Sequence, residues 1–155
     1  MVGVKDVPAE MLIEKAAEKL KEIDAIYIPK WAPYVKTGIH KEKRPVDPEW
    51  WYTRTAAVLR KVYIHGPIGV MRLSAMFGGR VDRGSKRYHP VRGSRSIIQT
   101  SLVQLENAGL VIKDGKKGRK ISPEGQKFLD NLSYEILKDL AEKRPELKKY
   151  LSKKK

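Results

Sequence analysis

The sequence predicts a mainly α-helical fold that contains one β-hairpin. Apolar residues recur at spacings of three and four in five segments, which is the pattern of helices with one buried face. Two short β-prone runs flank a glycine-containing turn at 114–118, and this arrangement is typical of a hairpin. The chain has 155 residues, 41% of them hydrophobic, so it can bury one substantial core. We therefore expect a single domain, 1–155.

The N-terminal part, 1–47, is expected to form a helix followed by an extended segment. Leu12, Ala16 and Leu20 share one face of a helix from about Pro8 to Ile23, and a proline suits its first turn. Three prolines and one glycine then interrupt the apolar residues of 24–46. This composition predicts an extended segment that packs over the core.

A second helix is predicted to begin at Asp47 and Pro48, which provide a cap and a first-turn proline, and to continue to Tyr63. Trp51 and Leu59, with the apolar residues between them, predict its buried side. A second face lies about a quarter turn away. It contains Trp50, Arg54, Ala57 and Lys61.

The remaining elements alternate short helices with glycine-containing breaks. A short helix is predicted at 70–77, but 79–95 has no apolar residue at helical spacing and is expected to form a long basic loop. Another helix covers 96–108, and Gly109 follows it where a left-handed C-cap favours glycine. Ser122 caps a final helix to about residue 143, followed by a Lys-rich tail.

Three helices followed by a two-stranded hairpin are the elements of a winged helix-turn-helix core. We place this core at 48–121, its hairpin or wing at 113–120, and the C-terminal helix and basic tail at 122–155. The core is expected to include Leu102, Leu105, Leu110 and Ile112. Such a pattern indicates a fold without indicating a ligand, since the same leucines and glycines serve both DNA regulators and RNA-binding proteins.

The charge of the chain points to a polyanionic partner. The formal net charge is +15; residues 50–95 hold ten basic residues and one acidic residue, whereas 1–49 hold nine of each. Cations in such excess repel one another unless a polyanion supplies the counter-charge, which leaves nucleic acid and an anionic membrane as candidates. The basic segments have no exposed apolar face beside them, so a membrane surface is disfavoured.

The candidate nucleic-acid-binding residues come from the second face of the helix that begins at 48, from the basic loop 79–95 and from the wing. Acidic residues are absent between Trp50 and Val81, so the cations there have no local ion-pair partner, and we expect phosphate contacts. The full set is Trp50, Arg54, Arg60, Lys61, Arg80, Arg83, Lys86, Arg87, Arg92, Arg95, Lys116, Lys117, Arg119 and Lys120.

Aromatic residues near these cations are candidates for stacking on splayed bases, as RNA-binding proteins often do. They are Trp50, Tyr88 and Trp31. For Trp50, burial beneath the extended N-terminal segment is an equally good interpretation.

Two features favour folded RNA over duplex DNA as the ligand. A basic loop of sixteen residues, 80–95, stands where a DNA-reading helix-turn-helix has a turn of about three or four. The outer face of the helix at 96–108 carries Ser96, Thr100, Val103 and Asn107, with no Arg or Lys to pair with guanine. Cations on loops, wing and core helix suit the phosphates of an irregular RNA.

The sequence shows no catalytic constellation, and we expect no enzyme activity, no metal and no cofactor. His40, His65 and His89 lie far apart, without the spacing of metal ligands. The absence of cysteine excludes disulfides and cysteine-ligated zinc, and it suits a reducing compartment. The N-terminus has no basic cap followed by an apolar stretch, so we expect a cytoplasmic protein.

The block Trp50–Arg54, together with the long basic loop, is the most specific sequence feature. Further characteristic positions extend along most of the chain, at 4–7, 28–31, 35–37, 60, 69–70, 78–80, 92–94, 104–106 and 118–125. With these features the sequence resembles the ribosomal protein S19e family of the archaeal and eukaryotic small subunit. The Lys-rich end after Pro145 is not required by the family pattern.

The resemblance implies a non-enzymatic component of the small ribosomal subunit that binds ribosomal RNA and supports subunit assembly and maturation of that RNA. It also implies that the helix with Trp50, Arg54, Arg60 and Lys61 faces the RNA. The expected partners are small-subunit ribosomal RNA and neighbouring small-subunit proteins, with no membrane and a monomeric free chain. The alternative is a dimeric winged-helix transcription regulator that binds duplex DNA.

Overall fold

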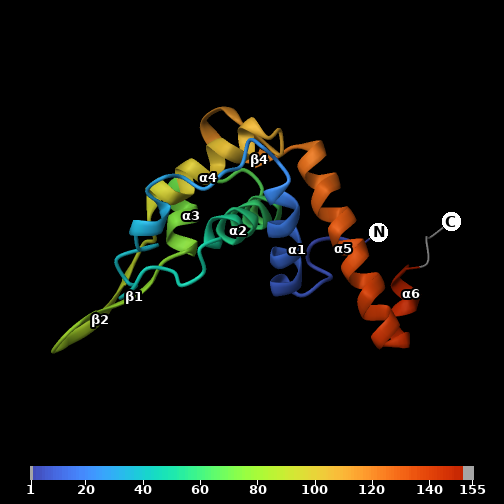
Figure 1. Ribbon diagram of the computed structural model, residues 1–155, viewed down its shortest axis with the longest axis horizontal. Helices are drawn as coiled ribbons and strands as arrows, with labels where there is room; N and C mark the ends of the chain where they lie inside the picture. Colours follow the sequence, from blue (N-terminus) through green and yellow to red (C-terminus); the bar gives the residue numbers. More distant parts are fainter. Residues whose placement is uncertain (1, 152–155) are drawn as a thin grey trace.

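The computed structural model describes residues 2–151, and the basic tail predicted at Lys153–Lys155 lies outside them. Figure 1 shows a mainly helical arch, with a two-stranded ribbon projecting from one end and the C-terminal helices at the other. In chain order the elements are α1 (Ala9–Lys21), η1 (Ala32–Tyr34), α2 (Trp50–His65), α3 (Val70–Met76), β1 (Gly79–Arg83), β2 (Lys86–Val91), α4 (Arg95–Asn107), β3 (Val111–Lys113), η2 (Gly115–Lys117), β4 (Arg119–Ile121), α5 (Pro123–Lys143), η3 (Pro145–Leu147) and α6 (Lys148–Leu151). This is the predicted mainly α fold with a wing, β3–β4.

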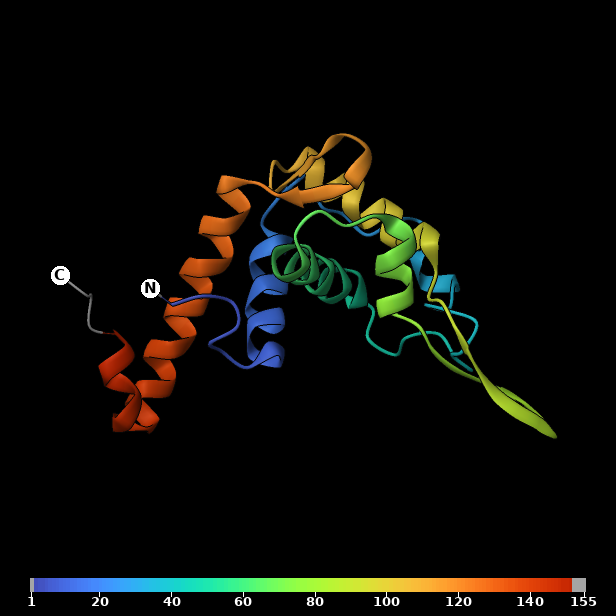
Figure 2. The same ribbon diagram turned by 180° about the vertical axis from the view of Figure 1, so that it is seen from behind.

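The core lies where α2 packs against α1 and α4, and where α5 covers the other side of α1. Seen from behind, α1 and α4 flank α2, and α5 lies on the far side of α1 (Figure 2). The apolar faces predicted from spacing are buried, including Leu12, Leu59, Leu102 and Leu105, none of which is exposed to solvent. Ile112 was expected in the core but is 40% exposed. Because side chains alternate along a strand, Val111 points inward and Ile112 points outward.

The predicted ends at Gly109 and Ser122 are confirmed, and Ser94, for which no cap was predicted, caps α4; Pro8 precedes α1 and does not lie in its first turn. The Ser94 and Ser122 hydroxyls accept hydrogen bonds from the amides of Ile97 and Gly125, at 3.4 and 3.0 Å. Gly109 follows α4 with φ +77°, the left-handed conformation that favours glycine. The predicted cap at Asp47 is wrong.

Asp47 instead stabilises the turn that precedes α2. Its carboxylate accepts a hydrogen bond from the amide of Glu49, and α2 begins only at Trp50. The proline at 48 therefore lies in this turn rather than in the first turn of the helix. None of the helices in residues 2–151 is both long and apolar enough to span a bilayer.

The wing is attached to the core through a third short segment. β3 and β4 pair with Val111 opposite Ile121, and Ile68 exchanges backbone hydrogen bonds of 2.9 and 3.0 Å with Arg119 on the other side of β4. Gly118, with φ +107°, turns the chain into β4 where a methyl group would lie 2.5 Å from the carbonyl carbon of Ile68. The close approach of two backbones therefore requires glycine here.

Candidate nucleic-acid interface

The segment predicted as a basic loop, 79–95, is mostly an antiparallel ribbon. Gly79 pairs with Val91 and Val81 with His89, and a register shift follows before Arg83 pairs with Lys86. The turn contains Gly84, at φ +72°, whose amide donates to the Asp82 carboxylate at 2.9 Å. The prediction of a loop is therefore wrong for 79–91. The strands were missed because the ribbon has little apolar patterning, and most of its residues are exposed.

The base of the ribbon is fixed by backbone contacts with two distant segments. The amide of Gly93 donates to the carbonyl of Ser74 at 2.8 Å, and the amide of Ser94 donates to the carbonyl of Thr37 at 3.0 Å. Gly38 forms an isolated bridge with Gly93, and the ring of His40 lies against Gly38 and Gly79. These contacts hold the ribbon in a defined direction, away from the helical core (Figure 1).

The ribbon presents cations with almost no compensating acid. Arg80, Lys86 and Arg87 are exposed, and Asp82, the acidic residue of the ribbon, is engaged in the turn. Arg83 is exposed as well, but its guanidinium donates to the carbonyl of Arg87 at 2.6 and 2.8 Å. Within residues 2–151, no ion pair involves any of these cations. A surface of this kind attracts phosphates over a range set by the ionic strength.

The cations of α2 are less accessible than those of the ribbon. The Arg54 guanidinium carbon lies 4.6 Å from the centre of the Phe77 ring, and burial lowers the pKa of Arg54 below its usual range. Arg60 is partly buried, and its Nε has no hydrogen-bond partner in the described part of the chain. Lys61 is partly exposed on the same helix. Partly buried cations without an ion-pair partner are suited to an anionic ligand.

Trp50 is 8% exposed, which agrees with the interpretation that it is buried beneath the N-terminal segment. The Trp50 ring packs edge-on against the Trp51 ring, with 5.5 Å between their centroids. The Trp31 ring packs against the Trp51 ring at the same distance. Trp31 is 36% exposed, whereas Tyr88 on the ribbon is 62% exposed. Of the three aromatic candidates, Tyr88 is the one most available for stacking.

The wing divides its four candidate cations into two groups. Lys116 and Lys117 are exposed at the tip. Arg119 pairs with Glu106 at 3.2 Å with only 12% of its side chain exposed, and Lys120 pairs with Asp114 at 3.6 Å. Arg119 therefore has a structural role in the free protein, whereas Lys120 makes only an exposed ion pair.

Several basic residues near the interface were not among the sequence candidates. Arg72 is exposed on α3 next to Met71, whose sulfur lies 3.8 Å from Arg92 and 3.6 Å from Arg95. Lys41 and Lys43 line a pocket with Arg54, and Lys36 and Lys41 line a second one with Arg80. A finer charge count would have found the lysines, since residues 30–46 alone hold five basic residues and one acidic residue.

The helix that would read DNA in a winged-helix regulator is α4, and its surroundings do not favour that role. The carbonyl of Tyr27 accepts a hydrogen bond of 2.9 Å from the side chain of Gln104, which anchors the segment before η1 against α4. The exposed positions of the helix beyond Arg95 are uncharged. They are Ser96, Gln99, Val103 and Asn107. This face has no cation to contact phosphates and no fork to pair with guanine.

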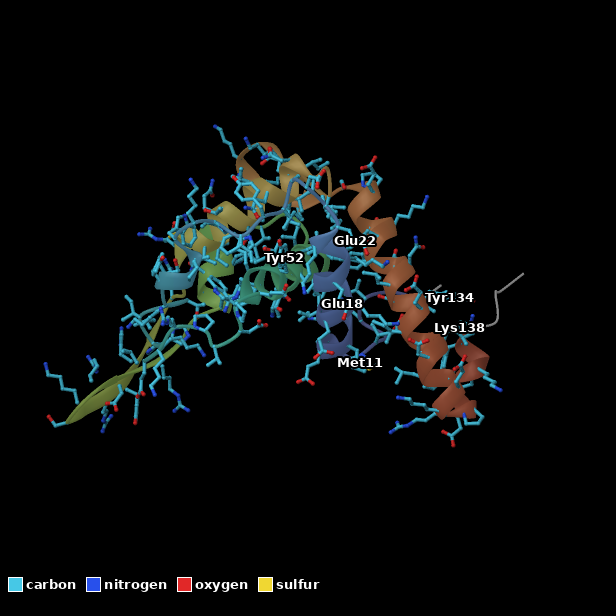
Figure 3. The ribbon with its side chains drawn as sticks, in the orientation of Figure 1. Met11, Glu18, Glu22, Tyr52, Tyr134 and Lys138 are labelled. Carbon is cyan, nitrogen blue, oxygen red and sulfur yellow. The ribbon has the colours of Figure 1, made fainter. Side chains whose placement is uncertain are left out.

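The exposed acids of the N-terminal helix lie away from the ribbon. Figure 3 shows Glu18 on α1 and Glu22 directly after it, both well separated from the tip of β1–β2. Ion pairs in this part of the molecule include Lys15 with Asp139 at 2.6 Å and Lys21 with Glu49. Positive and negative charges thus neutralise each other around α1, while the positive charges of the ribbon remain uncompensated.

Comparisons with known proteins show the family of the chain. The family model described as ribosomal protein S19e matches residues 3–139. The chain is 53% identical to small ribosomal subunit protein eS19 of Thermoplasma acidophilum, over 97% of this chain and all of that protein. The identity is 45% to eS19 of Aeropyrum pernix, with the same coverage, and 41% to eS19B of Schizosaccharomyces pombe, over 89% of this chain and 96% of that protein. The chain therefore belongs to the ribosomal protein S19e family.

Proposed function

We propose that this chain is a structural constituent of the small ribosomal subunit that binds ribosomal RNA. The relatives reported above are small ribosomal subunit proteins, and their similarity covers nearly the whole chain. The family is one of ribosomal proteins, not of enzymes. On this proposal the protein acts in the cytoplasm as part of the ribosome, and it supports subunit assembly and maturation of the RNA.

The observation that carries RNA binding is the continuous basic surface from α2 to the ribbon. Lys41 belongs to the wall of both pockets, so the surface around Arg54 adjoins the surface around Arg80. Acids in residues 2–151 pair with cations of α1, β3 and β4, and with none of the ribbon. This surface can contact several phosphates from separate elements, namely α2, the loop before it and the ribbon. Such an arrangement suits a folded RNA better than one groove of a duplex.

The test is a comparison of binding to a small-subunit ribosomal RNA transcript and to random duplex DNA of equal length. We expect much tighter binding to the transcript, with an affinity that falls steeply as salt rises, because phosphate contacts release counterions. Equal affinity for the two ligands would contradict the proposal and would favour the alternative of a DNA-binding regulator. The free protein is proposed to be monomeric, which sedimentation of the same sample measures.

A further inference from the structure

The pocket beside the N-terminal half of α2 combines an apolar wall with a basic rim. Its volume is about 530 Å³, which lies in the usual range of roughly 300–1,000 Å³ for pockets that hold small ligands. The apolar side comes from α1, α2 and the residue after α3, through Ile13, Trp50, Ala57 and Phe77. Lys41 and Lys43 line the pocket from the loop that precedes α2.

Arg54 is the central polar group of this pocket. Its guanidinium lies over the Phe77 ring, and within the described residues it makes neither a hydrogen bond nor an ion pair. The pocket contains one acid, Asp47, whose carboxylate accepts the amide of Glu49. Three cations and one acid leave a net charge of +2 around a mainly apolar cavity, so an anionic ligand with a flat apolar body would complement it.

We propose that this pocket receives one unpaired nucleotide of the bound RNA, extruded from its stack. The base would lie against the face of α2 that carries Trp50, Arg54 and Ala57, beside the Phe77 ring, while Lys41 and Lys43 contact its phosphates. Unstacked RNA bases are commonly held on aromatic rings and guanidinium planes. Trp50, which is too buried to stack on an RNA from outside, would then contact the base from within the pocket.

The second pocket supports this path for the RNA. It lies between the loop with Lys36 and Lys41 and the ribbon residues Arg80 and Tyr88, and its volume is about 650 Å³. Because Lys41 lines both pockets, a strand that crosses the ribbon can continue to Arg54 without leaving the basic surface. The inference rests on the proposed RNA-binding function and adds a site where a single nucleotide is held.

The test fills the pocket without changing its charge. Ala57→Phe places a ring in the cavity, and Thr53→Phe does so from one turn earlier on α2 in case the first variant does not fold. Ala25→Phe is the matched control, because Ala25 is partly exposed in the turn after α1 and lies outside the pocket. Thermal unfolding identifies the variants that are folded.

Each folded protein is bound to a small-subunit ribosomal RNA transcript, and affinity and base-specific chemical modification are measured. We expect the pocket variants to bind about ten- to a hundredfold more weakly, the range that one stacked base contributes. We also expect one unpaired base that the wild type protects to become reactive, while protections made by the ribbon remain and Ala25→Phe behaves as wild type.

Two results would overturn the inference. Pocket variants with wild-type affinity and an unchanged modification pattern would show that no nucleotide enters, even though the protein binds RNA. If these variants bind the RNA normally but are not incorporated into small subunits, the pocket binds a neighbouring protein instead. A wild-type protein that does not bind the transcript would contradict the proposed function itself, and the nucleotide site with it.

Discussion

Gln104 joins three parts of the molecule, and its replacement by methionine is expected to destabilise the fold. The side chain is 3% exposed on α4; it accepts a hydrogen bond from Trp51 Nε1 at 2.8 Å and donates one to the Tyr27 carbonyl at 2.9 Å. Methionine has a similar volume but leaves the buried indole N–H unpaired, which costs about 1–3 kcal/mol, and the lost bond to Tyr27 adds about 1 kcal/mol.

The expected loss of about 2–4 kcal/mol corresponds to a melting temperature roughly 4–16 °C lower for a domain of this size. Circular dichroism measures the unfolding, and tryptophan fluorescence reports the surroundings of Trp51. Gln99→Met is the matched control, because Gln99 is exposed on the same helix and should change stability by less than about 0.5 kcal/mol. Equal melting temperatures for the two variants would refute the claim that Gln104 anchors the N-terminal segment.

Two further predictions concern the wing and the hydrogen bond between α2 and α5. Gly118→Ala should lower the free energy of unfolding by at least about 2 kcal/mol, since it places a methyl group 2.5 Å from the Ile68 carbonyl at φ +107°. Gly115→Ala is the control and should lose less stability, because its methyl group would have no atom within 4 Å. Similar losses for the two variants in urea denaturation would argue against the close approach of the two backbones. Burial and then the hydrogen bond to Asp130 raise the pKa of Tyr63 to about 12, above its ordinary value near 10. This favours the neutral phenol, so its contribution to stability is complete below pH 10 and is lost as pH rises to 12. The stability difference between wild type and Tyr63→Phe should shrink over that interval, and a difference that stays constant would exclude the linkage.

The sequence predicted the helices and the wing well because their signals are local. Spacing located the buried faces, and Ser122 and Gly109 lie at helix ends with the capping geometry that their residue types favour. The ribbon at 79–91 was missed because its fixing contacts are not local. They involve the carbonyl of Ser74 and the bridge to Gly38, which no short stretch of sequence reveals.

For the candidate site, the sequence predicted the composition of the surface but not its geometry. The concentration of positive charge in 50–95 was visible in the sequence, but the accessibility of each cation was not. Arg119 resembles Lys116 in a charge count, yet it is nearly buried beside Glu106, whereas Lys116 is exposed. The lysines of 36–43 were hidden because the acids on either side of 30–46, at 22, 24, 47 and 49, balance them in the count of 1–49, although the folded chain brings these lysines next to Arg54 and Arg80.

The central claim is that the ribbon binds ribosomal RNA through its phosphates, and the salt dependence of binding tests it most directly. The triple variant Arg80→Gln, Lys86→Gln, Arg87→Gln removes exposed cations of the ribbon. The matched triple variant Lys127→Gln, Lys138→Gln, Lys143→Gln removes the same charge from α5, where Figure 3 shows Lys138 far from the ribbon.

With a small-subunit ribosomal RNA transcript, the slope of log affinity against log salt should fall by about 2–3 for the ribbon variant, roughly one for each lost phosphate contact. The α5 variant should keep nearly the wild-type slope, and both variants should melt close to the wild type, because every substituted residue is exposed. Equal slopes for the two variants would contradict the account, since the loss would then depend on net charge and not on the ribbon.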